Sequence, residues 1–354
     1  MSEHPLVSVV ITGLNEEYNI KNCIHSILFS QSYPNYEVTY VDGGSSDRTM
    51  EIIESIMKNA PGPAASKIKI VKDVRSTRSK ARNTGITCSN GDIIAFLDAD
   101  CVAPNNWLQR LVETLKKTGD KIGGIGGPYA IPEQATKKIF IIFRALNTPF
   151  GGSILTVQFA NEASRTKIVN AVPAGNSAYW RKTLENVGGF NPDLRYCEDS
   201  DLCRRIIAES GKKILFDPEL YVFHHSKVTG FSSLFRLMHN YGAGRVDAYF
   251  SERKLFSGTR MLPAFSILLF FSLIFAGAFS GIFLIVTFYL VLIYIAIALA
   301  SSIYLTMERK DISYMLAFFV YPTAHISYGL GTIISLIKNV AIHAKRKLEQ
   351  THDS

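Results

Sequence analysis

Charged residues are absent from one long stretch of the chain, although they make up 19% of its 354 residues. The segment Leu262–Thr306 contains no Asp, Glu, Lys or Arg. A membrane-spanning helix needs roughly 20 apolar residues, and the core helices of soluble proteins are usually shorter. This segment therefore predicts two spans with a tight turn near Ala276–Gly281, and a second apolar stretch follows from Tyr314 to Ile337.

Cysteine is also scarce, because the chain has five cysteines that form no CxxC pair. An odd number without paired spacing predicts free thiols in a reducing compartment. The first residues, Met1–Gly13, lack a basic segment followed by an apolar core. We therefore expect no cleaved signal peptide and an N-terminal domain that stays in the cytoplasm.

The net charge of +8 could by itself indicate nucleic-acid binding. Much of this excess, however, lies beside the apolar stretches, where positive residues mark the cytoplasmic side of a membrane protein. We therefore expect membrane lipids as partners, no nucleic acid, and an integral protein of the cell membrane. The residues concerned are Arg253, Lys254, Arg260, Lys338, Lys345, Arg346 and Lys347.

The N-terminal part alternates short apolar runs with amphipathic patterns. Such alternation predicts an α/β fold with a parallel sheet, although the pattern becomes mixed after Pro104. Polar clusters follow the strand ends, and the carboxyl ends of parallel strands share one edge of a sheet. We therefore expect these clusters to converge on one crevice. The predicted strands are Leu6–Thr12, Tyr36–Val41, Lys67–Val71 and Ile93–Leu97, followed by Ile122–Tyr129, Val172–Trp180 and Lys213–Phe216.

Asp98-Ala99-Asp100 directly follows a buried apolar strand. Two carboxylates at this spacing can both reach one divalent cation, and Mg²⁺ or Mn²⁺ prefers oxygen ligands that it shares with phosphates. The alternative is a solvated acidic turn. His224-His225 ends a later strand-like run, and we choose His225 as the third metal ligand, with a structural histidine as the alternative.

Two further clusters suit a nucleotide. Asp42 ends its strand and begins a segment, Asp42–Asp47, whose glycines let the backbone approach a ligand and whose last residues can cap the next helix. Asn15 and Glu16 follow the first strand. Arg75, Arg78, Lys80 and Arg82 form a basic run, which serves either a diphosphate or a solvated helix face.

Three acids open a later helix: Glu198, Asp199 and Asp201. The helix macrodipole accounts for one or two of them, and another is a general-base candidate. Gly175-Asn176 lies in an apolar segment that predicts the wall of an acceptor pocket. Arg236 and Arg245 lie in the amphipathic stretch Phe231–Arg245 and suit a phosphate or a diphosphate of the acceptor.

These motifs, in their order and approximate spacing over about Pro5–His225, resemble the family 2 inverting glycosyltransferases with the GT-A nucleotide-sugar-binding (Rossmann-like) fold. The resemblance implies that Asp42 contacts the nucleotide base, Asp98 the ribose or metal, and Asp100 the metal. Asp199 would be the base. The family often has Pro-Thr-Tyr where this chain has Thr12-Gly13-Leu14, and this difference affects the contacts that stack on the nucleotide base.

The membrane end, with His325 and Tyr328-Gly329-Leu330-Gly331, resembles members that build surface polysaccharide or lipid-linked glycans. We therefore expect a sugar to pass from a UDP- or GDP-sugar to a hydroxyl of a lipid-linked acceptor, with inversion, at the cytoplasmic face. Alternatives are a polyprenyl-phosphate glycosyltransferase, a nucleotidyltransferase and a non-enzymatic receptor. Assembly into a homo-oligomer is left open.

Four segments follow from these observations. Residues 1–228 form the catalytic domain, 229–261 amphipathic interfacial helices, 262–337 transmembrane or re-entrant segments, and 338–354 a basic cytoplasmic tail. A third full span would carry the basic tail outside, against the positive-inside bias. The stretch Tyr314–Ile337 also carries Pro322, Gly329 and Gly331, which weaken a straight helix. We therefore predict a re-entrant or interfacial hairpin broken near Pro322, with a third full span as the alternative.

Overall fold

The computed structural model describes residues 4–152, 165–194, 196–252 and 258–352. Arg253, Lys254 and Ser354 lie outside the described residues. The chain divides into two compact units, Met1–Gln134 with Val157–Ser226 and Ala135–Thr156 with Lys227–Ser354. The segment 135–156, which the sequence placed in the catalytic domain, thus belongs to the second unit.

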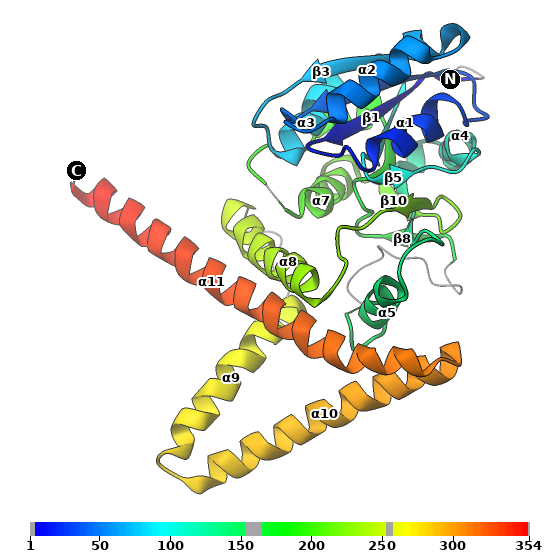
Figure 1. Ribbon diagram of the computed structural model, residues 1–354. Helices are drawn as coiled ribbons and strands as arrows, with labels where there is room; N and C mark the ends of the chain where they lie inside the picture. Colours follow the sequence, from blue (N-terminus) through cyan, green and yellow to red (C-terminus); the bar gives the residue numbers. More distant parts are fainter. Residues whose placement is uncertain (1–3, 153–164, 195, 253–257, 353–354) are drawn as a thin grey trace. The chain divides into compact units, whose positions relative to one another are not determined.

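The first unit holds all the described strands and the helices that cover them (Figure 1). Most bounds lie within two residues of those expected, but the strand expected at Ile122–Tyr129 is two strands. In chain order the elements are β1 (Val7–Gly13), α1 (Ile20–Leu28), β2 (Tyr36–Asp42), α2 (Thr49–Asn59), η1 (Gly62–Lys67), β3 (Ile68–Lys72), α3 (Arg78–Thr87), β4 (Ile93–Asp98), β5 (Cys101–Val102), α4 (Trp107–Thr118), η2 (Gly119–Lys121), β6 (Ile122–Gly126), β7 (Tyr129–Ala130), β8 (Lys167–Val169), β9 (Asn176–Trp180), α6 (Arg181–Asn186), α7 (Glu198–Ser210), β10 (Lys213–Phe216) and β11 (Val222–His224).

The main sheet is mixed, with strand order β3-β2-β1-β4-β9-β6-β10-β8. The predicted parallel arrangement is confirmed for β3, β2, β1 and β4. β9 and β8, in the part of the chain where the sequence pattern becomes mixed, run antiparallel to their neighbours. β9 starts where β4 ends, since Asn176 pairs with Leu97, so it can only run back. A second sheet, β5-β11-β7, has three short strands.

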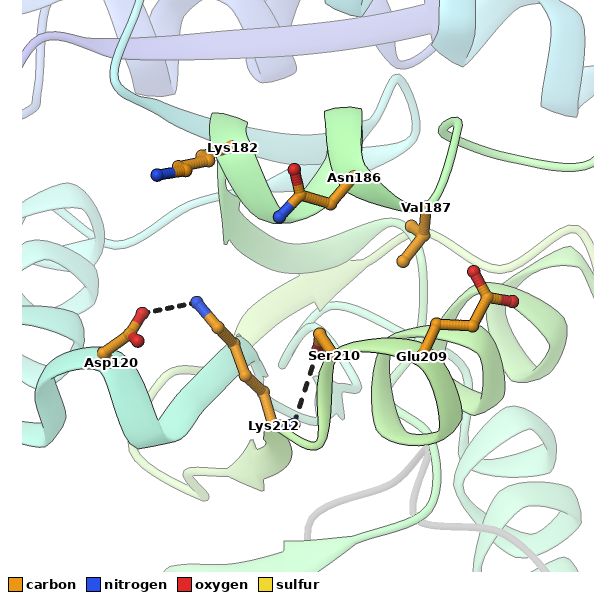
Figure 2. Close-up of a pocket in the computed structure, with 7 residues that line it drawn as sticks. All are labelled: Asp120, Lys182, Asn186, Val187, Glu209, Ser210 and Lys212. Atoms are coloured by element: carbon orange, nitrogen blue, oxygen red, sulfur yellow. Dashed lines mark hydrogen bonds and ion pairs between the residues drawn. The ribbon is translucent and has the colours of Figure 1, made fainter.

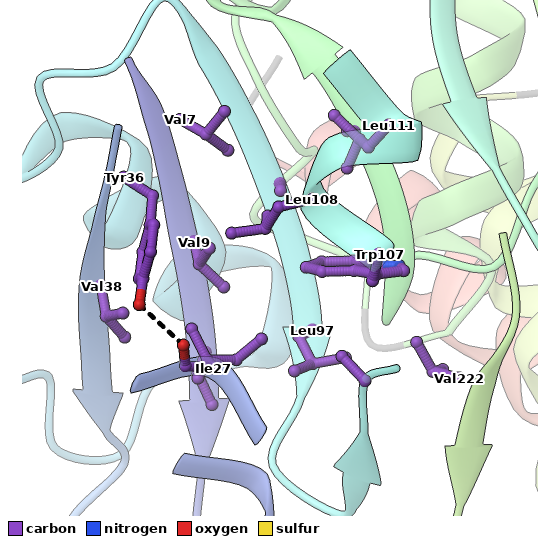
Figure 3. Close-up of a cluster of buried hydrophobic side chains, with 14 of the residues drawn as sticks. Val7, Val9, Ile27, Tyr36, Val38, Leu97, Trp107, Leu108, Leu111 and Val222 are labelled. Atoms are coloured by element: carbon purple, nitrogen blue, oxygen red, sulfur yellow. Dashed lines mark hydrogen bonds between the residues drawn. The ribbon is translucent and has the colours of Figure 1, made fainter. Parts of the chain in front are cut away.

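The main sheet is buried on both faces, as its alternating side chains require. Val7, Val9 and Ile11 of β1 join one apolar cluster with α1 and α4, whereas Val10 joins another with α3 and α7. Figure 3 shows the first cluster, in which Trp107 is 1% exposed. Burial on both faces fixes the strand register, and the register fixes which side chains end each strand.

The second unit is helical. It contains α5 (Lys137–Leu146), α8 (Phe231–Glu252), η4 (Gly258–Met261), α9 (Leu262–Gly277), α10 (Gly281–Arg309), η5 (Ile312–Leu316) and α11 (Ala317–His352). Among the described residues, two helical segments, Gly258–Gly277 and Gly281–Arg309, are long and apolar enough to cross a membrane. Their side chains are largely exposed, Phe275 to 71%, which is unlike the core helix of a soluble protein. α9 and α10 form the V-shaped hairpin of Figure 1.

α11 is one continuous helix of 36 residues that contains Pro322. The predicted break near Pro322 is therefore wrong. Tyr321 and Ala324 on either side of it are fully buried, and this packing holds the helix together. The glycines taken as helix breakers are packing points instead. A side chain at Gly331 would collide with the His239 carbonyl of α8, and one at Gly329 with the Pro263 carbonyl of α9.

Candidate active site

Three neighbouring strands end together in the first unit. Gly13 pairs with Asp42, and Thr12 with Asp98, so β1, β2 and β4 bring their carboxyl ends to one edge. This is the edge at which ligands bind in open α/β sheets. The strand ends therefore lie together at one edge of the sheet, as expected from the sequence.

Asp42 and Asn15 organise the loop after β2. The Asp42 carboxylate, only 2% exposed, accepts hydrogen bonds from the backbone N–H groups of Gly44 and Ser45 and from the Ser45 hydroxyl. Asn15 has a positive φ of 56°, and its Oδ1 accepts from the N–H of Ser46 at 2.9 Å. Both side chains thus have structural tasks that the sequence did not reveal.

Glu16 lies at the entry to α1. Its carbonyl accepts the N–H of Ile20, and its carboxylate accepts from Asn19 Nδ2 at 3.2 Å. Its own N–H donates to Thr49 Oγ1 at 2.8 Å. These contacts tie the start of α1 to α2, beneath the same loop. A nucleotide contact for Asn15, Glu16 and Asp42 remains a prediction.

Arg82 joins two acids from distant parts of the chain. Its Nη2 donates to Asp98 Oδ1 at 3.0 Å, and its Nη1 donates to Glu198 Oε1 at 2.8 Å. Burial lowers the pKa of Arg82, but the charges of Asp98 and Glu198 outweigh it, so the net pKa is raised and the guanidinium stays charged. Arg82, expected to bind a diphosphate, is 3% exposed and holds Asp98 and Glu198 instead.

Asp98 is fixed from the other side by Tyr129 and Gly175. The Tyr129 hydroxyl donates to Asp98 Oδ2 at 3.1 Å, and burial raises the pKa of this phenol well above its usual value. Gly175 lies so close that a side chain there would overlap the carboxylate. Gly175, expected in an acceptor wall, therefore makes room for Asp98.

Asn176 is fully buried and supports the same strand end. Its Oδ1 accepts from Trp107 Nε1 at 3.0 Å, and its Nδ2 donates to the carbonyls of Pro128 and Leu220. All these partners belong to the protein. Asn176 is thus a structural residue, and its environment does not support the acceptor contact expected from the sequence.

The small sheet brings a histidine to Asp100. His224 pairs with Cys101 across β11 and β5, and its Nε2 lies 3.4 Å from Asp100 Oδ2. The ring stacks on Tyr129 with 4.6 Å between centroids. His225, chosen from the sequence, instead donates its backbone N–H to the Asp100 carbonyl. The neighbouring histidine is therefore the better ligand candidate.

Potential ligand atoms of Asp100, Cys101 and His224 lie within 4.8 Å of one another. Burial, then the charges of Asp100 and Asp98, raise the pKa of the Cys101 thiol well above its usual value, which leaves a neutral thiol poorly suited to a hard cation. Burial lowers the pKa of His224, but the hydrogen bond with Asp100 and the nearby acids raise it overall. Asp100 and His224 thus form a donor set that fits a divalent cation such as Mg²⁺ or Mn²⁺, with Asp98 two residues from Asp100.

The three acids in the first turn of α7 differ in burial and in their partners. Glu198 pairs with Arg82, and the fully buried Asp201 pairs with Arg204 and Arg205 at 2.9 and 2.8 Å. Asp199 is partly exposed, and its Oδ1 accepts from the N–H of Ser200 at 2.6 Å. Of these three acids, Asp199 is the one that is not buried, so solvent or a substrate can reach it.

The remaining predicted residues are basic. Arg78 begins α3 and is exposed, and its charge is close enough to oppose protonation of His224. Arg236 and Arg245 lie on α8 of the second unit, so their acceptor role stays a prediction. Tyr129 was missed, because the pairing of β7 with β11 that brings it to Asp98 and His224 leaves no local pattern in the sequence.

The first unit also has a polar pocket of about 340 Å³ between η2, α6 and the end of α7 (Figure 2). Asp120 and Lys212 form an ion pair there, just before β6 and β10 begin. Because β6 and β10 run parallel to each other and in the same direction as β4, their beginnings lie at the opposite edge from Asp98. This pocket is therefore separate from the candidate active site.

Comparisons with known proteins find relatives that are named as glycosyltransferases. Glycosyltransferase AglE of Haloferax volcanii is 29% identical over 252 residues, which cover 70% of this chain and 76% of that protein. A dolichyl N-acetyl-alpha-D-glucosaminyl phosphate 3-beta-D-2,3-diacetamido-2,3-dideoxy-beta-D-glucuronosyltransferase of Methanococcus voltae is 32% identical over 126 residues, covering 34% of this chain and 38% of that protein.

One solved structure extends the likeness to both units. It is the mannosyltransferase PcManGT from Pyrobaculum calidifontis in complex with GDP-Man and Mn²⁺, with a TM-score of 0.59 and 19% identity over 94% of this chain and 88% of that one. At this identity it supports the GT-A fold. The model of the family described as glycosyl transferase family 2 matches residues 8–187, and the chain therefore belongs to that family of glycosyltransferases.

Proposed function

We propose that the protein transfers a sugar, with inversion, from a nucleoside-diphosphate sugar to a hydroxyl of a lipid-linked saccharide. The observation that carries this proposal is the ion-pair network Asp98–Arg82–Glu198. It ties the strand end that faces the donor to the turn of α7 that holds Asp199. One charged side chain thus fixes the distance between a donor site and a candidate base.

The donor side is supported by Arg78, Asp98 and Asp100. Arg78 is an exposed cation near His224, where a diphosphate can reach it. Asp100 and His224 would hold a divalent cation, which supplies positive charge to the departing diphosphate. Asp98, oriented by Arg82 and Tyr129, would accept a hydrogen bond from the ribose or lie close to the cation.

The acceptor side is supported by Asp199. Its carboxylate would take the proton of the attacking hydroxyl, while the oxygen of that hydroxyl forms a bond with the anomeric carbon. The bond between this carbon and the diphosphate breaks on the opposite face, and its electron pair leaves with the nucleoside diphosphate. A single displacement of this kind inverts the anomeric configuration.

The lipid-linked acceptor is supported by the exposed apolar helices and by the dolichyl-phosphate-linked sugar in the name of the Methanococcus voltae relative. We propose that α9 and α10 cross the membrane, with the catalytic unit in the cytoplasm, where nucleotide sugars are made. Two crossings return the chain to that side. α11 would then lie at the cytoplasmic surface.

The test is a panel of UDP-, GDP- and dTDP-sugars with purified full-length protein, Mn²⁺ and lipid-linked saccharides. We expect release of a nucleoside diphosphate that depends on the acceptor, and a product with inverted anomeric configuration by NMR. Release of pyrophosphate would instead identify a nucleotidyltransferase. Transfer of the sugar to a lipid phosphate that carries no saccharide would instead identify a polyprenyl-phosphate glycosyltransferase.

A further inference from the structure

The second unit contains an apolar groove between α8, α9 and α11, with a volume of about 240 Å³. Residues from all three helices line it, including Val246, Tyr249, Phe265, Leu268, Ile333 and Leu336. Phe265 and Leu268 are 60% and 52% exposed, so the α9 wall of the groove is uncovered. Because α9 is also one of the two membrane-span candidates, hydrocarbon is the environment that this wall fits.

A cationic side chain lies beside this groove. Arg245 stands one turn before Tyr249, which lines the groove, so these two side chains lie on the same side of α8. Gly242, three residues earlier, packs against the Tyr328 carbonyl of α11, which confirms that this side of α8 faces the helices around the groove. Arg245 Nη1 is buried and has no hydrogen-bond partner within the described part of the chain.

The nearest acid on α8 has other partners. Asp247 Oδ1 accepts from Ser335 Oγ at 2.6 Å and from Asn339 Nδ2 at 2.8 Å, both on α11. A buried guanidinium N–H without an acceptor carries an uncompensated desolvation cost, which an anionic ligand would remove. The planar guanidinium suits the oxygens of a phosphate, and the groove suits a hydrocarbon chain.

We infer that this groove binds the lipid part of the acceptor, a single-chain lipid phosphate of the polyisoprenyl type. Its phosphate contacts Arg245, and the first part of its chain lies against Val246 and Phe265. A groove volume of about 240 Å³ suits a single chain better than the two chains of a glycerophospholipid. This inference rests on the proposed lipid-linked acceptor, and it adds the site at which that lipid binds.

The test measures binding of a photoreactive polyisoprenyl phosphate to the full-length protein in detergent micelles, without a nucleotide sugar. We expect Arg245→Gln to weaken binding about tenfold, which corresponds to about 1.4 kcal/mol. Arg245→Lys should weaken it less. Leu268→Trp fills the groove from its exposed side and should also weaken binding. Lys182→Gln removes an exposed charge from α6 of the first unit and should leave the affinity unchanged.

Competition by unlabelled lipids tests whether the site recognises the phosphate and the single chain. Unlabelled polyisoprenyl phosphate should compete better than polyisoprenol and better than phosphatidylglycerol. Equal competition by polyisoprenol would refute the role of Arg245, and equal competition by phosphatidylglycerol would show that the groove holds ordinary membrane lipid. Thermal melting of each variant, compared with the wild type, excludes misfolding as the cause of a loss.

Sugar transfer, measured in parallel, separates this inference from the proposed function. If the wild type transfers sugar to a lipid-linked acceptor but the Arg245→Gln and Leu268→Trp variants keep full lipid affinity, the groove assignment is wrong and the function stands. If the groove binds the lipid phosphate as expected but no sugar is transferred, the groove assignment stands and the proposed acceptor is wrong.

Discussion

The two units treat polar and apolar side chains in opposite ways. In the first unit Arg82 is 3% exposed and neutralised by two acids, whereas in the second unit Phe279 is 79% exposed. The first unit hides charge by pairing it inside an apolar sheet. The second leaves apolar surface uncovered and sets the distances between its helices with glycines. The packing of the catalytic unit thus depends on pairs of opposite charges, and the packing of the helical unit depends on close contacts between helices.

Removing the shared cation should have the largest effect. Arg82→Met leaves the buried Glu198 and the partly exposed Asp98 without their shared counter-charge, so we expect a loss of about 3–5 kcal/mol of stability and of all activity. Thermal unfolding by circular dichroism measures it. Arg82→Lys keeps the charge, but a single ammonium group cannot bond both acids as the planar guanidinium does. Its stability should therefore lie between those of the wild type and Arg82→Met. A melting temperature equal to wild type for Arg82→Met would show that the network is not stabilising.

The acids of α7 come next. Asp199→Asn should lower turnover by about 10²–10⁴-fold, the usual contribution of a general base, while donor binding survives. Calorimetry with the donor and nucleotide release with the acceptor measure the two effects. Glu209→Gln, at the far end of the same helix, is the matched control and should be neutral. If Asp199→Asn abolishes donor binding, Asp199 belongs to the donor site.

Metal binding follows in magnitude. Asp100→Asn should lower Mn²⁺-dependent turnover at least about 100-fold, in line with a loss of several kcal/mol of transition-state stabilisation. The neighbouring histidines give a matched pair, because His224→Ala should weaken Mn²⁺ binding and His225→Ala should not. Isothermal titration with Mn²⁺ reports both. The reverse order would restore His225 as the ligand.

The helical unit should respond to a single methyl group. Gly331→Ala places that group against the His239 carbonyl, so we expect a loss of about 1–3 kcal/mol from overpacking. Gly281→Ala is the control, since a side chain there meets no atom of the described residues within 4 Å. Melting of the full-length protein in detergent compares the two. Equal melting temperatures would mean that the α8–α11 contact is not tight.

The smallest effect is expected at the pocket of Figure 2. Lys182→Ala removes an exposed charge at the edge of the sheet away from Asp98. We expect unchanged turnover and a stability within about 0.5 kcal/mol of wild type. A clear loss of donor affinity in the same calorimetric assay would mean that this pocket communicates with the active site.

The sequence predicted the order of strands and helices in the first unit because each element carries its own pattern. β1 is an unbroken β-branched run, and α1 shows Cys23, Ile24 and Ile27 on one face. The place of the acids at strand ends follows from this local information. The resemblance to family 2 glycosyltransferases and the expected GT-A fold rest on the same local motifs, and both are confirmed.

What the sequence could not predict are contacts between distant segments. Arg82 and Glu198 are separated by 116 positions, and no local pattern reveals that they meet. His224 and His225 differ only by the register of β11 against β5, in which one step exchanges the faces of the strand. Pro322 and the glycines of α11 read as breaks, although burial in helix contacts compensates for their weak propensity.

The hairpin of α9 and α10 has arms of unequal length, and this has a consequence for the bilayer. The segment Gly258–Gly277, with 20 residues, is about 30 Å long, and α10, with 29 residues, is about 44 Å long. A hydrocarbon core of about 30 Å matches the shorter arm but not the longer one. In the proposed topology α10 must therefore tilt or emerge from the core. Hydrophobic mismatch of this kind sorts proteins between membranes of different thickness, so lipid chain length should affect where and how well this enzyme works.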